Sequence, residues 1–195
     1  RKQIVPRKIP GGPMFDPTSD NLKVRMRYCK LLVMNANATP QDIETYVFRA
    51  NSIWDPEYTG IGRKALGLSY YQDMYNKYRV LRSTIKITPA DNNQKGMCFI
   101  WKSPRNILAS TDFETTIEKK ETVVKSLRDE SGSLWHSFNM REDKHLESEP
   151  WTGMGSNPTG DWFFFVGHNS LNATQLLVEL FYDVELSDRK PIVSA

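Results

Sequence analysis

The sequence predicts an all-β protein in which two antiparallel sheets pack face to face. Eight segments alternate apolar and polar residues, or are rich in β-branched and aromatic residues, as strands are. Only two short segments have helical character, and the connections between strands are long and variable. Eight strands with such connections fit two packed sheets, and the jelly roll is the commonest such arrangement. Strand order alone does not separate it from another sandwich.

The first half of the chain yields three strands and one long excursion. In residues 22–36, Val24, Met26 and Tyr28 alternate with arginines, which is the two-residue period of a strand. Residues 43–50 and 78–88 are β-branched and aromatic. The segment between them, residues 51–77, contains turn residues and then a short amphipathic helix around residues 70–75.

The second half yields five strands and a second short helix. Asp91-Asn92-Asn93 turns the chain into a strand, and Asp129-Glu130-Ser131-Gly132 is a hairpin-type turn. In the last strand, Leu180, Tyr182 and Val184 share one face. The expected elements are strands at 95–102, 121–128, 134–140, 161–168 and 174–186, with a helix at 112–119.

The first residues form a separate region. Residues 1–21 are basic and rich in proline and glycine, which excludes a helix, so we expect an extended arm ahead of a domain over residues 22–195. The net charge of +3 conceals an asymmetry, because residues 1–30 carry eight Lys/Arg against two Asp. A basic end on a near-neutral body indicates binding to a polyanion.

Composition excludes several classes of protein. A chain of 195 residues with 39% hydrophobic residues fits one domain with a core. Its longest apolar runs are far shorter than the roughly 20 residues of a spanning helix, so we expect no membrane insertion. Cys29 and Cys98 fall in expected strands, and we expect both to be reduced, because a secreted disulfide scaffold would carry more cysteines.

No motif for catalysis, a cofactor or a metal is present. His136, His145 and His168 are at least eight residues apart, and no Cys-x-x-Cys or His-x-x-x-His spacing occurs. We expect His136 to pack in its sheet. There is no Gly-x-Ser-x-Gly motif and no phosphate-binding loop. We therefore expect no catalytic residues, no cofactor, no metal site and no enzymatic activity.

Charged residues on three strands predict one shared surface. If the sheets form a jelly roll, the last strand lies between the first and the third. Its acidic residues then meet two basic rows, as a neutralising cross-strand ladder or as part of a lining that contacts nucleic acid. The residues concerned are Arg25 and Arg27, Glu179, Asp183 and Glu185, and Arg82 and Lys86.

Aromatic residues outside the expected strands form a second candidate surface. They could pack beneath long loops, form contacts between subunits or provide a sugar-binding platform. Aromatic residues are enriched at the centres of interfaces. The residues expected at a subunit interface are Trp54, Tyr58, Tyr70, Tyr71, Tyr75 and Trp151.

Three motifs carry a resemblance to a known family. They are Phe48-Arg49-Ala50-Asn51-Ser52-Ile53, Asp55-Pro56 and Tyr75-Asn76-Lys77-Tyr78-Arg79-Val80. With these motifs, residues 46–89 resemble the capsid proteins of circular, Rep-encoding single-stranded DNA viruses, the circoviruses and their relatives. Residues 161–190 resemble them less closely. The resemblance favours an eight-stranded jelly roll with long inter-strand loops and one or two short helices.

The resemblance implies a structural protein of the virion. Copies of the chain would close into a small icosahedral, T=1-like shell around a circular single-stranded DNA genome, assembled in the host nucleus. The outer loops would bind a host cell-surface receptor or glycan. The residues expected to bind nucleic acid are Arg1, Lys2, Arg7, Lys8, Lys23, Arg25 and Arg27.

Two other functions remain open from the sequence. One is a carbohydrate-binding jelly-roll module, which would not explain the basic arm or the long excursion. The other is the coat protein of a small RNA or satellite virus, which would have the same fold and arm.

Overall fold

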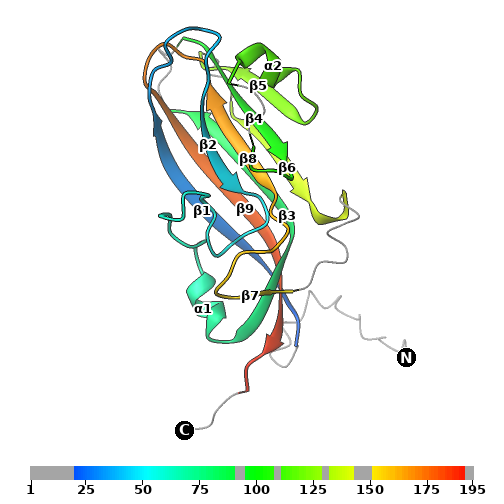
Figure 1. Ribbon diagram of the computed structural model, residues 1–195. Helices are drawn as coiled ribbons and strands as arrows, with labels where there is room; N and C mark the ends of the chain where they lie inside the picture. The colour runs from blue at the N-terminus through cyan, green and yellow to red at the C-terminus, as the bar shows by residue number, and fades with distance from the viewer. Residues whose placement is uncertain (1–19, 91–94, 108–110, 129–131, 143–150, 192–195) are drawn as a thin grey trace, which may run out of the picture.

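Two antiparallel sheets pack face to face in the computed structural model (Figure 1). It describes residues 20–90, 95–107, 111–128, 132–142 and 151–191. The basic cluster expected in the arm, at Arg1, Lys2, Arg7 and Lys8, lies outside these residues. The described strands begin at Leu22.

The first sheet has the order β1-β9-β3-β6, and a two-residue strand, β7, is added beside β3. Strand β9 pairs along nearly its whole length with β1 on one side and β3 on the other. These three strands are therefore the longest in the molecule. The strands of this sheet are β1 (Leu22–Met34), β9 (Thr174–Arg189), β3 (Tyr75–Pro89), β6 (Leu134–Asn139) and β7 (Thr152–Gly153).

The second sheet has the order β2-β8-β4-β5. Strand β8 is buried along its whole length, because its sequence FFFVGH is apolar and one of its faces meets the first sheet. The strands are β2 (Glu44–Arg49), β8 (Phe163–His168), β4 (Met97–Ser103) and β5 (Thr122–Ser126).

The connections identify the sandwich as a jelly roll. The chain crosses from one sheet to the other at every step along the main strands except between β4 and β5, and the first and last strands are neighbours. The prediction of an eight-stranded jelly roll is thus confirmed, and the expected position of the last strand between the first and the third is correct.

The core lies between the sheets and is formed by the alternate residues of each strand. Three tyrosines, Tyr28, Tyr78 and Tyr182, are among its largest fully buried side chains. The hydroxyl of Tyr182 donates to the backbone carbonyl of Arg49 across the sandwich, at 2.9 Å. Cys29 and Cys98 are both free thiols, and Cys98 is buried in this core.

Several boundaries differ from the prediction. Strand β3 begins three residues early because Tyr75 still pairs with Arg189, the extended end of β9. Strand β8 begins late because Trp162 bonds instead to Asn51, whose side-chain oxygen accepts from the Trp162 backbone N–H at 3.0 Å. Strand β7 was not predicted, since two residues carry no periodicity.

Both expected helices are present but are short. Helix α1 (Leu68–Gln72) ends before Tyr75. Helix α2 (Phe113–Ile117) begins after Asp112, whose carboxylate accepts from the backbone N–H of Thr115 at 2.8 Å. A 3-10 turn, η1 (Met140–Glu142), follows β6. None of the helices in the described part of the chain is long and apolar enough to cross a membrane.

Candidate nucleic-acid interface and subunit contacts

The face of the first sheet that points away from the core carries charged residues from three adjacent strands. We call it the charged face. The register of β1, β9 and β3 brings six basic residues beside three acidic ones. The basic residues are Lys23, Arg25, Arg27, Arg79, Arg82 and Lys86, and the acidic residues are Glu179, Asp183 and Glu185.

The expected cross-strand ladder is present on the charged face. Arg25 Nε lies 2.9 Å from Asp183 Oδ1, and Arg79 Nη2 lies 2.7 Å from Glu185 Oε2. Glu179 is held from both sides, by Lys86 Nζ at 2.9 Å and by Arg27. Hydrogen bonds from Lys86 and Arg27 lower the pKa of Glu179, although burial opposes this. The ladder therefore favours the ionised form of Glu179 and fixes the two cations beside it.

The ladder leaves an excess of three positive charges. Lys23 and Arg82 are exposed, and neither forms an ion pair with any residue in the described part of the chain. Arg25 and Arg27 keep 70% and 53% of their side-chain surface accessible while paired. A neutralising ladder and a lining that contacts nucleic acid are thus compatible interpretations of these charged rows, because the ladder still leaves a basic surface.

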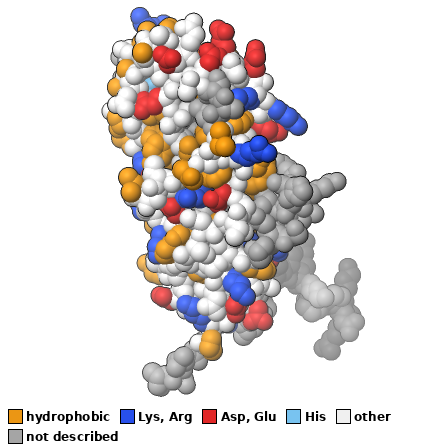
Figure 2. Space-filling model, in the orientation of Figure 1, with side chains coloured by type: hydrophobic (Ala, Val, Ile, Leu, Met, Phe, Trp, Pro, Cys, Tyr) orange, Lys and Arg blue, Asp and Glu red, His pale blue; other side chains and the backbone are white. Residues whose placement is uncertain are grey.

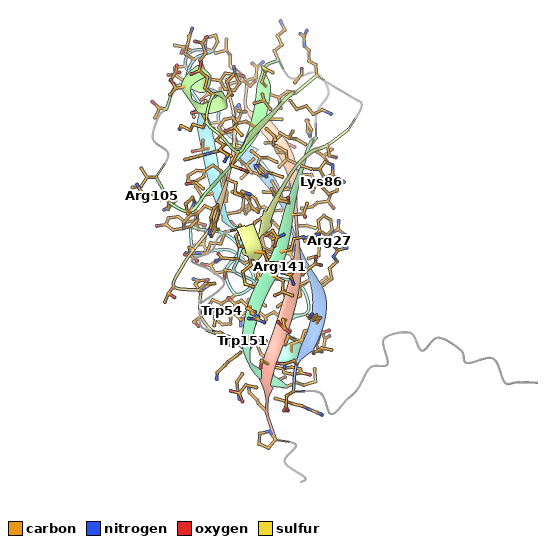
Figure 3. All side chains as sticks on the ribbon, turned by 90° about the vertical axis from the view of Figure 1, so that its right-hand side faces the viewer. Arg27, Trp54, Lys86, Arg105, Arg141 and Trp151 are labelled. Carbon is orange, nitrogen blue, oxygen red and sulfur yellow. The ribbon has the colours of Figure 1, made fainter. Side chains whose placement is uncertain are left out.

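Two aromatic side chains on the same face were not predicted as site residues. Trp135 of β6 is 48% exposed, and its ring is nearly parallel to that of Phe181 on β9, with centroids 6.4 Å apart. Arg27 lies over Phe181 and Lys86 lies over Trp135. Alternation in each strand would have placed both rings on this face, but only the register shows that they are close. Figure 3 places Arg27 and Lys86 on the same side of the sheet, with Arg105 on the opposite side of the molecule.

The excursion after β2 is held to the sandwich by buried ion pairs. Arg49 contacts Asp55 Oδ2 at 2.7 Å and Asp161 Oδ2 at 3.3 Å. Glu57 is 2% exposed and accepts hydrogen bonds from Lys30, Tyr28 and Tyr46. Burial alone would raise the pKa of Glu57, but these three donors hold it below its usual value. These polar contacts hold the excursion to the sandwich, and its exposed apolar residues take no part in them.

The six aromatic residues expected at a subunit interface divide into three groups. Tyr70 and Tyr58 are 75% and 43% exposed. Trp54 and Tyr71 are half-buried and pack against the core, and Trp151 is half-buried beneath Arg79, with the guanidinium carbon 4.4 Å from a ring centroid. Tyr70 and Tyr58 therefore offer more surface to another subunit than the three half-buried residues do.

Tyr75 forms the third group, and its expected position outside the strands is wrong. It opens β3 and is 6% exposed, because the pairing of β3 with β9 extends to it and turns its side chain into the core. It has almost no surface to offer a neighbouring subunit.

Three further apolar residues near the excursion are exposed and were not predicted. Ile61, Leu66 and Met74 are 87%, 69% and 44% exposed, close in sequence to Tyr70. We call Ile61, Leu66, Tyr70 and Met74 the excursion patch. On the face seen in Figure 2, hydrophobic side chains gather mainly in the upper half, whereas α1, which carries Tyr70, lies in the lower half (Figure 1). The sequence offered only a weak signal, because single exposed apolar residues are common, and it is the structure that shows all four to be exposed.

The histidines do not form a metal site in the described part of the chain, where no group of three or more His, Cys, Asp or Glu could hold a metal ion. His136 packs in β6 as expected, with 10% of its side chain exposed and Nε2 2.7 Å from the backbone carbonyl of Glu121. His168 is fully buried. His145 lies outside the described residues.

Comparison with known proteins finds similar structures but no similar sequences. No protein-family model matches it, and no curated protein matches it by sequence. Among solved structures, it is similar to Cocksfoot mottle virus, with a TM-score of 0.63 and 12% identity over 88% of this chain and 97% of that chain. It is also similar to the 60-mer BFDV capsid protein, with a TM-score of 0.58 and 7% identity over 90% of this chain and 97% of that one.

A third similar structure is a virus-like particle of Macrobrachium rosenbergii nodavirus, with a TM-score of 0.54 and 11% identity over 91% of this chain and 100% of that chain. The similar structures include capsids of a circovirus, BFDV, and of RNA viruses. The chain thus has the jelly-roll fold of viral capsid proteins.

Proposed function

We propose that this chain is a viral coat protein whose copies close into a small icosahedral shell around a single-stranded nucleic acid. The observation that carries the proposal is the extent of the structural match. Almost the whole of two capsid subunits, 97% of each, corresponds to 88% and 90% of this chain. The match therefore covers most of this chain and not one shared motif.

The proposed orientation places the charged face toward the interior of the shell. Its three excess positive charges complement phosphates, and each neutralised phosphate releases a condensed counterion. Arg25 and Arg27 remain mostly accessible to phosphates although each is paired with a carboxylate of the ladder. The basic cluster at Arg1, Lys2, Arg7 and Lys8 would add to the same interaction.

The proposed contact between subunits is the excursion patch. Its four apolar residues are exposed and follow, along the chain, a segment that the ion pair between Arg49 and Asp55 holds to the sandwich. A segment that is already ordered loses less conformational freedom when a neighbour covers it. Weak contacts of this kind add together in a closed symmetric assembly. Other outer loops would meet the host receptor or glycan.

We propose circular single-stranded DNA as the cargo, with assembly in the host nucleus, on the strength of the sequence resemblance at residues 46–89. RNA is the second candidate, because the match to Cocksfoot mottle virus has a higher TM-score than the match to BFDV and RNA virus capsids are among the similar structures. Digestion of nucleic acid extracted from the particles with DNase or RNase separates the two.

Sedimentation velocity of the purified chain at near-physiological salt tests the coat function. The proposal predicts a fast, narrow boundary from closed particles, in place of the slow boundary of a 22.5 kDa monomer. A monomer that persists as the protein concentration rises would contradict the proposal and favour a carbohydrate-binding module, which a glycan array would then detect.

A further inference from the structure

The charged face contains a recess between two aromatic rings. Trp135 and Phe181 project from β6 and β9, and their ring planes differ by 18°. Thr84 of the intervening strand β3 lies directly opposite Phe181. A hollow of about 200 Å³ is lined by these three residues and Arg25. The short side chain of Thr84 therefore forms the floor of a hollow with aromatic walls.

Cations edge this hollow on both sides. The Arg27 guanidinium carbon lies 5.5 Å from the centroid of the Phe181 ring, and Lys86 Nζ lies 5.3 Å from the Trp135 centroid. Both cations also bind Glu179, so their positions are fixed. An exposed aromatic surface on a monomer would normally attract other apolar surfaces, but this one is surrounded by positive charge.

A second hollow lies beside the first. Its lining includes Arg82 and Arg141, both of which are exposed. The two hollows are linked by the ion pair between Arg25 of the first and Asp183 of the second, at 2.9 Å. Arg82 is two residues from Thr84 along β3, about 7 Å at the rise of a strand. The remaining residues of the second hollow are Leu81, Asn139 and Met140.

We propose that these two hollows bind one segment of single-stranded nucleic acid, with a base stacked on Trp135 and Phe181 and a neighbouring phosphate held by Arg82 and Arg141. Aromatic platforms edged by cations bind single strands because every base has a π-face, whatever the sequence. The bases of a duplex are stacked on one another and cannot offer that face. The inference rests on the proposed function, since it names the residues that would hold the packaged strand.

The second sheet provides a matched control. Trp101 of β4 and Phe165 of β8 also form an aromatic pair, with centroids 4.9 Å apart, and Lys119 lies over Trp101. Phe165 is only 2% exposed, however, and Trp101 is half-buried, so this pair offers no comparable platform. Substitution of Trp101 therefore removes a tryptophan and a cation–π contact without removing the proposed site.

The test is fluorescence anisotropy of labelled ten-nucleotide oligonucleotides, dT10, rU10 and a ten-base-pair duplex, with the full chain. Wild type should bind at least one single strand more tightly than the duplex. Trp135→Ala should weaken that binding about tenfold, given the usual contribution of one stacked base. Trp135→Phe should retain most of the affinity, and Trp101→Ala should leave it unchanged.

Salt dependence separates stacking from phosphate binding. Trp135→Ala should leave the slope of log affinity against log salt unchanged, whereas Arg82→Ala should reduce its magnitude by about 0.7. Equal losses from Trp135→Ala and Trp101→Ala, or duplex binding as tight as that of both single strands, would overturn the inference. Sedimentation of the same variants reports assembly independently, so a failure of the coat function and a failure of this site give different results.

Discussion

At the residue scale, the buried carboxylate of Glu57 connects the excursion to the first sheet. Lys30 and Tyr28 come from β1, Tyr46 comes from β2, and all three donate to Glu57. The sequence did not single out this residue, because an acidic residue next to Asp55-Pro56 is also typical of a solvent-exposed turn. Only the fold brings its three donors together.

Glu57→Gln keeps the shape of the side chain and removes its charge. It leaves the Lys30 ammonium, only 28% exposed, without its counterion. We expect the free energy of unfolding to fall by about 2–4 kcal/mol, measured by urea denaturation. Glu118→Gln, at an exposed position, is the control and should change stability by less than about 0.5 kcal/mol. Equal stability of both variants would show that the buried ion pair is not a stabilising anchor.

His168 makes stability depend on pH. Burial lowers its pKa to about 4, and its Nδ1 accepts from the backbone N–H of Ser170 at 3.0 Å, which fits the neutral ring. Between the ordinary pKa of 6.5 and this value, the unfolded chain binds a proton that the folded chain does not. Stability contributed by the neutral ring is therefore lost as the pH falls through this window.

The prediction is tested by thermal unfolding from pH 7 to pH 4 in wild type and in His168→Gln. The wild type should lose on the order of 3 kcal/mol from this group, and the variant should show a flatter profile. The side chain of Glu44, whose Oε2 lies 3.8 Å from His168 Nε2, is present in both proteins, so the prediction concerns the difference between their two profiles. Parallel profiles would contradict the assignment.

At the element scale, strands were predicted better than their ends and pairings. Alternation in β1, β3 and β9 gave the charged ladder, because which residues share a face follows from period two alone. The Trp135–Phe181 recess was missed because it depends on two strand registers and on the irregularity between Val80 and Arg82 in β3. A one-residue shift reverses every side chain, and no local pattern in the sequence fixes it.

The sequence analysis assigned both Tyr70 and Tyr75 to a subunit interface, but Tyr70 lies in α1 and Tyr75 opens β3. Their substitutions should therefore have different effects. Tyr75→Ala should destabilise the folded chain by about 3 kcal/mol, since it empties a core position. Tyr70→Ala should leave the thermal midpoint of the monomer unchanged and raise the protein concentration needed for assembly about tenfold. Calorimetry and light scattering measure the two effects.

Retained assembly in Tyr70→Ala at the wild-type concentration would exclude this residue from the subunit contact. Lys120→Ala, at an exposed position next to β5, is a control for surface truncation. It should change neither stability nor assembly.

At the scale of the whole molecule, the two sheets serve different roles in the proposed account. The first sheet carries three excess positive charges and an aromatic recess on one side, and the core on the other. Tyr70 of the excursion patch belongs to α1, which lies in the lower half of Figure 1. On the proposed function, one chain would present one surface to nucleic acid and another to its neighbours. The jelly roll itself was predictable from strand count and resemblance, but the division of surfaces required the register.

The most direct test is cryo-electron microscopy of the assembled chain. The account predicts closed particles of identical subunits, in which the charged face lines the interior and the excursion patch is covered by a neighbouring subunit. For a shell of 60 copies, as in the 60-mer BFDV capsid protein, the protein mass would be about 1,350 kDa. Particles with the charged face outward, or a chain that remains monomeric at high concentration, would contradict it.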